Sequence, residues 1–276
     1  MRTTKKGKFF LYLILTLGAL LILFPMYITI TTTFKTPAES AVSFFTLPKS
    51  LYLGNYATVL QDEKLYYAYG NTILITVVSL LGEMLILPPM GFALSRGMKQ
   101  NRFFKGLYFF FLLGIFLPWQ VRMMPVVKLM GWLGLLSPLG ITLLYVAHAT
   151  CESMFLYVGY LSTVSDSIEE AAYIDGAGDL RVYWSIILPL SKRAIATVAI
   201  IGFIGNWNSY MWPKVVATKE SLRTVQTGLR MLMQSDFGDD WGSIMAAATL
   251  ITMPMILFFV CLQRYFVQGI TKVGLK

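Results

Sequence analysis

Long apolar stretches are the feature of this 276-residue chain that most limits its possible folds. A helix needs about 20 mostly apolar residues to cross a membrane, and most of these stretches are close to that length. Charged residues make up only 13% of the chain, about half the usual share in a soluble globular protein. We therefore predict an all-α integral membrane protein with six transmembrane helices. The six stretches cover residues 9–34, 71–95, 104–121, 139–160, 195–213 and 243–263.

The first stretch follows a basic tail, an arrangement that secretory signal peptides share. The apolar run from Phe9 to Thr33 is longer than the core of a typical signal peptide, and no small-residue cleavage site follows it. We expect this run to be retained as the first span.

Prolines interrupt two of the expected spans. Pro118, with the polar Gln120 and Arg122, lies at the outer end of the third stretch. The pair Pro88-Pro89 in the second stretch, close to Gly91, predicts a break or a kink there.

The distribution of Lys and Arg predicts the orientation, because cytoplasmic segments beside the spans are enriched in these residues. Six spans place both termini on one side of the membrane, and 14 of the 23 basic residues lie in short segments on that side. The other nine are spread over longer loops. Both termini and the loop after the fourth span are therefore predicted to be cytoplasmic. The net charge of +9 is then explained by topology rather than by nucleic-acid binding. The 14 residues are Arg2, Lys5, Lys6, Lys8, Arg96, Lys99, Arg102, Lys105, Arg181, Lys192, Arg193, Arg264, Lys272 and Lys276.

The chain lacks the residue sets that an enzyme would need. It has one histidine, His148, and two cysteines, Cys151 and Cys261, which both lie in apolar stretches. Such sparse residues predict neither a disulfide framework nor a metal cluster. There is no glycine-rich phosphate loop. We therefore expect no catalytic residues, no metal or cofactor in this chain, and no ATP hydrolysis by it.

The loop at 161–194 holds the most specific pattern in the chain. Glu170-Ala171-Ala172 is followed three residues later by Gly176, and nine residues then lead to the segment Ile186–Pro189. The pattern either marks a specialised loop or belongs to an ordinary amphipathic surface helix between two spans.

Polar residues at the start of this loop predict where its helix begins. Ser167 with Glu170, or Asp166 with Glu169, has capping-box spacing, so we expect a helix to begin near Ile168.

Glycines and a proline predict how the rest of the loop continues. Gly176 and Gly178 allow a left-handed backbone that stops the first helix. Asp179 is placed to cap a second short helix, which Pro189 would end. The loop therefore predicts a helix–turn–helix along the membrane surface.

The spacing E-A-A-x3-G-x9-I-x-L-P resembles a loop of the membrane subunits of binding-protein-dependent ABC importers, where it docks into a cytoplasmic ATPase. Seven specified positions match at fixed spacing. The resemblance implies that Glu170 pairs with a basic residue of the ATPase, with simple helix capping as the alternative role. The residues that would contact or shape the contact with the ATPase are Glu169, Glu170, Ala171, Ala172, Asp175, Gly176 and Gly178.

Other stretches are similar to one subgroup of this family, the maltose-type sugar permeases, and together they cover nearly the whole chain. The C-terminal residues 270–276 depart from the subgroup's common Gly-Ala-Val-Lys-Gly finish, which puts any contact of that tail with the ATPase in doubt. The matching stretches are Lys35–Glu39, Pro48 with Asn55-Tyr56, Asn71, Trp207-Asn208 with Pro213, and Gln263–Gly269.

The resemblance implies a specific assembly. Residues 1–276 would form a single transmembrane permease domain, paired with a second and different permease chain in the cytoplasmic membrane of a prokaryote. Two ATPase subunits would use ATP and Mg²⁺, and an extracytoplasmic sugar-binding protein would deliver substrate from outside. Transport would proceed by alternating access, without nucleic acid. An oligosaccharide is the first choice of substrate, and a monosaccharide or a glycerol phosphate stays open.

Ionisable residues within the spans form a second set of candidates. Glu83 lies in the second span, and His148 and Glu152 lie four residues apart on one face of the fourth. Charges in a bilayer usually face protein or water. These residues therefore either line a translocation path or pack between helices. An ion-coupled secondary transporter using the three residues is the alternative function, although it would not need the Glu170 pattern.

Asn206, Trp207 and Asn208 in the fifth span are candidates for lining a sugar path. Amides both donate to and accept from hydroxyl groups, and Trp207 or Trp212 could stack on a sugar ring. The alternative is structural, because amides also join helices and tryptophans favour membrane interfaces.

The outer segment 214–242 combines acidic residues with an aromatic one. Asp236, Asp239, Asp240 and Trp241 predict either a docking surface for the binding protein or a solvated loop. Their spacing does not match an EF-hand calcium loop.

Overall fold

The computed structural model describes the backbone of residues 5–217, 219, 222–231, 233 and 240–273, with side chains up to Gln263. All regular structure within these ranges is helical, which confirms the predicted all-α class. Four helices are long and apolar enough to cross a membrane. They are α1 (Lys5–Thr33), α4 (Glu63–Gln100), α7 (Pro138–Leu161) and the part of α14 (Trp241–Val273) that ends at Gln263.

The two remaining predicted spans are bent. Helix α5 (Arg102–Phe116) and helix α6 (Trp119–Trp132) are bent by 105° from one another, so the apolar stretch 104–121 is not one continuous helix and is broken at Pro118, where the sequence showed an interruption. The cause is Pro118, which keeps the preceding Leu117 extended and cannot donate a backbone hydrogen bond.

The fifth predicted span is also divided. Helix α11 (Lys192–Trp207) ends at Asn208, and the short α12 (Met211–Val216) follows, so residues 195–213 do not form one helix. On its other side, α11 is bent by 71° from the segment Asp179–Leu190.

The expected break at Pro88-Pro89 does not occur, because α4 continues through both prolines to Gln100. Leu87 is buried in the core, and Gly91 lies directly against Tyr157 of α7. This packing around the prolines offsets the backbone hydrogen bonds that they remove.

The contacts between Cα atoms divide the chain into two compact units, residues 1–66 with 228–254 and residues 67–227 with 255–276. Within the first unit, α1 leads to α2 (Pro37–Val42) and α3 (Gly54–Gln61). No residue of the apolar window of α1 is buried.

The turn after α1 is fixed by buried polar contacts. The ammonium group of Lys35, which is fully buried, donates to the carbonyls of Ser43 at 2.9 Å and Phe44 at 3.0 Å. The Asn55 amide donates to the carbonyls of Thr33 and Lys35, both at 2.8 Å. Two of the family-like stretches thus share one structural role, which is to close this turn.

Between these stretches, Thr36 and Glu39 form a capping box at the start of α2. The threonine side chain accepts from the backbone of Glu39, and the glutamate side chain accepts from the backbone of Thr36.

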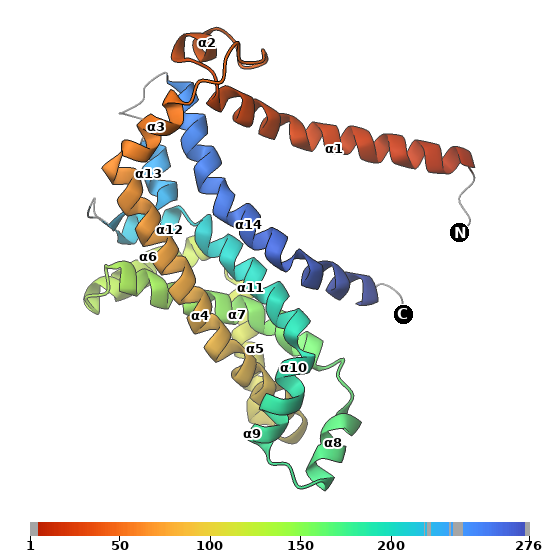
Figure 1. Cartoon of the computed structure of the whole chain (residues 1–276). Helices are drawn as coiled ribbons and strands as arrows, with labels where there is room; N and C mark the ends of the chain where they lie inside the picture. Colours follow the sequence, from red (N-terminus) through yellow and green to blue (C-terminus); the bar gives the residue numbers. More distant parts are fainter. Residues whose placement is uncertain (1–4, 218, 220–221, 232, 234–239, 274–276) are drawn as a thin grey trace. The chain divides into compact units, whose positions relative to one another are not determined.

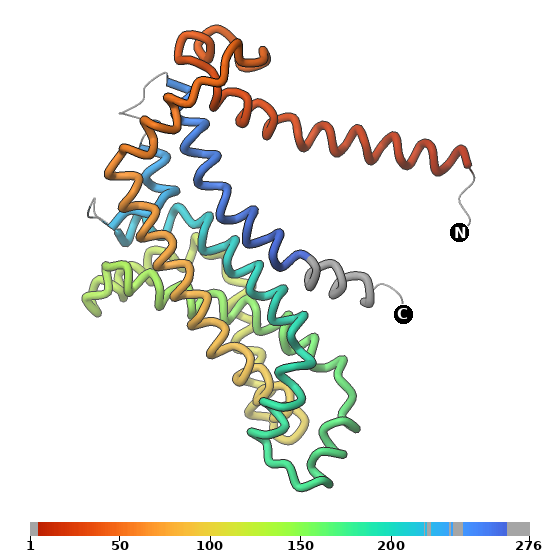
Figure 2. The backbone as a smooth tube through the Cα atoms, in the orientation of Figure 1, coloured from red at the N-terminus to blue at the C-terminus, as the bar shows by residue number. Residues whose placement is uncertain are grey.

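The second unit is built around α7, which packs against α5, α11 and α12 (Figure 1). Met154, Tyr157 and Leu161 of α7 are fully buried, together with Leu87 of α4 and Ile187 of the loop that follows α7. Figure 2 traces the chain from the end of α7 through this loop and back into α11. The loop is therefore held on the same apolar core as the spans.

Helix α13 (Val225–Met231) begins at an anchored segment. The Asn71 amide donates to the carbonyl of Arg223 at 3.0 Å, and the Thr72 hydroxyl accepts from the Val225 backbone at 2.8 Å. The start of the second span therefore holds residues 223–225 in place.

Candidate functional site

The loop at 161–194 forms a series of short helices. Helix α8 (Asp166–Ile174) ends at Gly176, whose φ of 81° confirms the predicted left-handed turn. Helix α9 (Asp179–Val182) follows, then a π-helical turn over Tyr183–Ile187 and α10 (Leu188–Leu190).

Three local expectations for this loop are wrong. Neither capping box forms at the start of α8, because Asp166 and Glu169 instead face cations on α4, and charge-assisted pairs are the stronger interaction. Asp179 does not cap α9 but lies inside its first turn, where it accepts from the Tyr173 hydroxyl at 2.9 Å. Gly178 has a φ of −83° and so does not adopt the left-handed conformation expected of it. The helical stretch that begins at Asp179 does end at Leu190, directly after Pro189, as predicted.

The inner face of α8 is bound to the end of α4. Glu169 is only 5% exposed, and its Oε2 accepts from Nε of Arg96 at 2.8 Å while Oε1 pairs with Nη2. Lys99 pairs with the exposed Asp166. The hydrogen bond from Lys99 lowers the pKa of Asp166, with a further contribution from the charge of Arg96. Both acids are therefore satisfied inside this chain.

The outer face of this loop differs. Glu170, Ala171, Asp175, Gly176 and Gly178 are exposed, whereas Ala172 packs against the core.

Large apolar side chains lie on the same loop. Ile174 is 86% exposed, and Leu180 and Trp184 are also well exposed. Exposed apolar side chains beside polar ones mark surfaces that meet another macromolecule.

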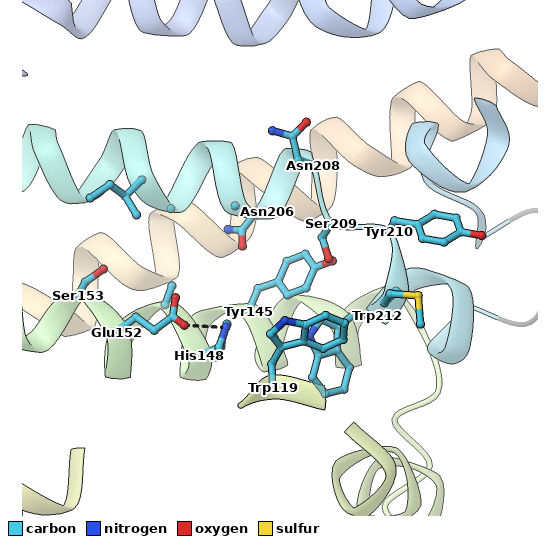
Figure 3. Close-up of a pocket in the computed structure, with 15 residues that line it drawn as sticks. Trp119, Tyr145, His148, Glu152, Ser153, Asn206, Asn208, Ser209, Tyr210 and Trp212 are labelled. Carbon is cyan, nitrogen blue, oxygen red and sulfur yellow. Dashed lines mark ion pairs between the residues drawn. The ribbon is translucent and has the colours of Figure 1, made fainter. Parts of the chain in front are cut away.

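A pocket of about 300 Å³ lies between α6, α7, α11 and the segment that leads to α12 (Figure 3). Its wall combines aromatic rings with amides and hydroxyl groups, which can both donate and accept hydrogen bonds. The lining residues are Trp119, Tyr145, His148, Ala149, Glu152, Ser153, Ile201, Gly202, Gly205, Asn206, Asn208, Ser209, Tyr210, Met211 and Trp212.

His148 and Glu152 are in contact in this pocket, with Nε2 and Oε1 3.2 Å apart. Nη2 of Arg122 lies 3.5 Å from Nδ1 of His148. Because a guanidinium can only donate, Nδ1 is the acceptor, and the Nε2 proton faces Glu152. The predicted shared helix face of His148 and Glu152 is therefore confirmed.

The predicted path residues separate into two groups. Asn206 and Asn208 line the pocket, as His148 and Glu152 do. The Asn206 Nδ2 is buried and has no hydrogen-bond partner among the described residues. Figure 3 shows this amide directed from α11 toward α7.

Trp207 and Glu83 do not line the pocket. Trp207 is 2% exposed and stacks on Phe203, with ring centroids 5.6 Å apart. Glu83 is fully buried behind the wall, where its Oε1 accepts from Ser153 at 2.7 Å and Gly202 lies against its Oε2.

The sequence interpretation missed Trp119 and Tyr145. Tyr145 precedes His148 by three residues, so helical spacing alone places it on the same face of α7. No comparable signal marked Trp119, because the bend at Pro118 brings it to the pocket.

The predicted outer docking surface is described only in part. Asp236 and Asp239 lie outside the described residues. Asp240 caps α14, because its Oδ1 accepts from the Ser243 backbone N–H at 3.3 Å and its Oδ2 from the Ser243 hydroxyl at 2.6 Å. Trp241 packs edge-on against Phe44, with ring centroids 5.5 Å apart.

Residues 89–272 match the family described as "Binding-protein-dependent transport system inner membrane component". The chain belongs to this family. It is thus a component of a transport system and not an enzyme.

Relatives of known name match over nearly their full length. The chain is 34% identical to the "Multiple sugar-binding transport system permease protein MsmG" of Streptococcus mutans, covering 99% of this chain and 98% of the relative. It is 32% identical to the "Probable starch degradation products transport system permease protein AmyC" of Thermoanaerobacterium thermosulfurigenes, covering 96% and 97%. It is also 32% identical to the "sn-glycerol-3-phosphate transport system permease protein UgpE" of Yersinia pestis, covering 95% of each.

A solved structure has the same fold. A chain of a bacterial ABC transporter involved in the import of the acidic polysaccharide alginate superposes with a TM-score of 0.84 at 25% identity, covering 96% of this chain and 99% of that one. These comparisons confirm the resemblance to ABC importer permeases. They give no support to the alternative of an ion-coupled secondary transporter.

Proposed function

We propose that this chain is one of two membrane subunits of an ATP-driven importer that moves a sugar, most simply an oligosaccharide, by alternating access. The exposed outer face of the 161–194 loop carries the proposal, because a family of transport components needs a surface where ATP hydrolysis is passed to the membrane. The names of two relatives, which refer to multiple sugars and to starch degradation products, support the substrate class. The glycerol phosphate relative keeps that alternative open.

The proposed topology has six crossings in a single permease domain, with both termini in the cytoplasm of a prokaryote. Four long helices and two bent pairs supply these crossings. The excess of Lys and Arg beside α1 and the loop at 161–194 supports the orientation.

The coupling step belongs to the loop at 161–194. We assign its docking face to Glu170, Ala171, Asp175, Gly176 and Gly178, and we infer that the Glu170 carboxylate pairs with a basic residue of the ATPase. ATP and Mg²⁺ are bound by two ATPase subunits, and this chain carries no cofactor. ATP can drive the switch only by binding the two conformations of the complex with different affinity.

The pocket is proposed to line part of the sugar path. The Asn206 amide supplies an unused donor, and the indoles of Trp119 and Trp212 supply flat apolar faces. His148 and Glu152 contact one another in this wall, where the imidazole Nε2 proton meets the carboxylate. Glu83 and Trp207 support the wall from behind.

A second, different permease chain and an extracytoplasmic binding protein complete the assembly. A further solved structure with the same fold, at 17% identity and a TM-score of 0.64, is titled as an alginate ABC transporter in complex with its pentasaccharide-bound periplasmic protein. That title supports a binding protein as the partner that delivers substrate here.

Affinity purification from the native membrane, followed by mass spectrometry of the partners, tests this proposal. We expect the wild type to recover an ATPase and a second permease, and Glu170→Ala and Gly176→Pro to lose the ATPase. Proline cannot adopt the φ of 81° at position 176. Glu63→Ala, an exposed acid at the start of α4, is the matched control and should retain it. Recovery of the intact chain with no ATPase would overturn the proposal.

A further inference from the structure

The loop at 161–194 joins α7 to α11 in the chain, yet its strongest polar contacts go to neither helix. They go to the last two turns of α4, which is about 70 residues away in sequence. Arg96 and Lys99 of α4 hold Glu169 and Asp166, both in the first turn of α8.

The Arg96 contact has the features of a fixed joint. Two guanidinium nitrogens engage the two oxygens of a carboxylate that is only 5% exposed, and such a bidentate pair fixes orientation as well as distance. The guanidinium also lies over the Phe92 ring at 5.9 Å and donates to the Ser95 hydroxyl at 3.3 Å. These two contacts within α4 position the guanidinium independently of α8.

The two adjacent glutamates of α8 face opposite sides. Glu169 faces inward and is satisfied by Arg96, whereas Glu170 faces outward and is exposed. A force applied to the outer face therefore reaches α4 across a single helix.

The same helix reaches the wall of the pocket. Glu83 lies 13 residues before Arg96 on α4, which corresponds to about 20 Å along a helix. Its carboxylate accepts from Ser153 and lies against Gly202, and both of these residues line the pocket. The prolines between the two points do not end the helix.

We propose that Arg96 and Lys99 are positioning residues that fasten α8 to α4, so that movement of the loop is delivered to the pocket wall through α4. This inference rests on the proposed function, and it names the route by which docking changes the path. Apolar packing of the loop on the core is the competing route, since Ala172 and Ile187 also join that core.

Substitutions at Arg96 and Lys99 in the reconstituted complex separate the route through the charged joint from the route through apolar packing. The complex of this chain with its ATPase, second permease and binding protein is placed in liposomes, and sugar transported per ATP hydrolysed is measured. We expect Arg96→Gln to keep the ATPase bound but to lower this ratio by about fivefold or more. Arg96→Lys should be intermediate, because an ammonium cannot make the bidentate pair. Lys99→Gln should have the smallest effect because that pair is exposed.

The exchanged pair Arg96→Glu with Glu169→Arg should recover most of the ratio that either single change removes. An Arg96→Gln complex that assembles normally and transports as much sugar per ATP as the wild type would overturn the proposal. Failure of the wild type to bind an ATPase would instead overturn the proposed function. If Arg96→Gln does not assemble, the exchanged pair decides: its failure to restore assembly and transport would count against the joint.

A distance measurement supplies an independent check. Spin labels at the exposed Ser167 of α8 and Gln100 of α4 report the separation of the two helices. We expect the same distance in nucleotide-free and ATP-bound complexes, because the joint moves as one body. A distance that changes between these states, in a complex that transports, would favour the apolar route.

Discussion

The loop at 161–194 and the pocket are both polar regions of an apolar chain, and they present their side chains in opposite ways. The loop pairs Asp166 and Glu169 with cations of α4 and leaves apolar side chains such as Ile174 exposed on its outer face. The pocket encloses amides and hydroxyl groups between helices. A large flat partner suits the first arrangement and a small hydroxylated ligand the second.

The largest effect is expected on the outer face of the loop. Ile174→Ser should weaken ATPase binding by about 10- to 100-fold, since burying an isoleucine contributes about 1.5–3 kcal/mol. Stability of the chain alone should not change, because this side chain is exposed. Titration of the solubilised complex with its ATPase measures the effect, and Leu51→Ser, another exposed apolar residue, is the control. Unchanged affinity would remove the loop from the interface.

The contact between Gly202 of α11 and Glu83 of α4, behind the pocket, should matter for the stability of the chain. A methyl group at Gly202 would meet the Glu83 carboxylate, so Gly202→Ala should destabilise the chain by about 1–3 kcal/mol. Gly205→Ala on the same helix meets no atom within 4 Å and should be neutral or slightly stabilising. Thermal unfolding in detergent compares the two. Equal melting temperatures would mean that α4 and α11 can separate freely at this point.

Within the pocket, Asn206→Leu removes a donor at nearly constant volume. Transport at low sugar concentration should fall by about tenfold, which corresponds to one hydrogen bond. ATPase binding should be unaffected. Ile201→Leu, which changes shape but no polar group in the same wall, should alter transport less. A larger loss from Ile201→Leu than from Asn206→Leu would assign the pocket to packing rather than to sugar binding.

The smallest expected effect is the pH dependence of stability that comes from the pair of Asp166 and Lys99 on the inner face of the loop. Because the folded-state pKa of Asp166 is lowered, chiefly by its hydrogen bond with Lys99, the pair stabilises the fold above the unfolded pKa. This stabilisation is lost as the pH falls through the lower, folded pKa. Asp166→Asn should therefore lower the melting temperature slightly at pH 7, and the difference should shrink as the pH falls below the ordinary pKa of an aspartate and vanish once Asp166 is protonated in the folded chain. A difference that persists in acid would point to shape rather than charge.

The two regions also differ in how far sequence alone predicted them. The loop is contiguous, so Glu170, Gly176 and their spacing were visible together, and the left-handed turn at Gly176 followed from residue type. Its inner contacts were not predictable, because Arg96 lies in another span and no local pattern connects it to Glu169. Capping spacing therefore suggested the wrong partners.

The pocket was predicted only in part because it is assembled from separate helices. Asn206 and Asn208 were identified as polar residues in an apolar stretch, and His148 with Glu152 by helical spacing. Trp207 was chosen by its chemistry alone, although its ring belongs to the core. The bends at Pro118 and Asn208 bring Trp119 and Trp212 to the cavity. Pro118 marks the position of the first bend in the sequence, but the apolar stretches do not encode the direction in which the following helix turns.

The bare surface of α1 has a consequence for how this chain can vary over evolutionary time. Since no residue in its apolar window is buried, Leu, Ile and Val are nearly interchangeable there as far as this subunit's own fold is concerned, and Phe24, whose ring stacks on Phe45, is an exception. Only at its end does the requirement become specific, where the Asn55 amide donates to the backbone carbonyls of Thr33 and Lys35. Substitutions can therefore accumulate on the surface of α1 and create contacts with other membrane proteins, while the turn that follows keeps the end of the helix in place.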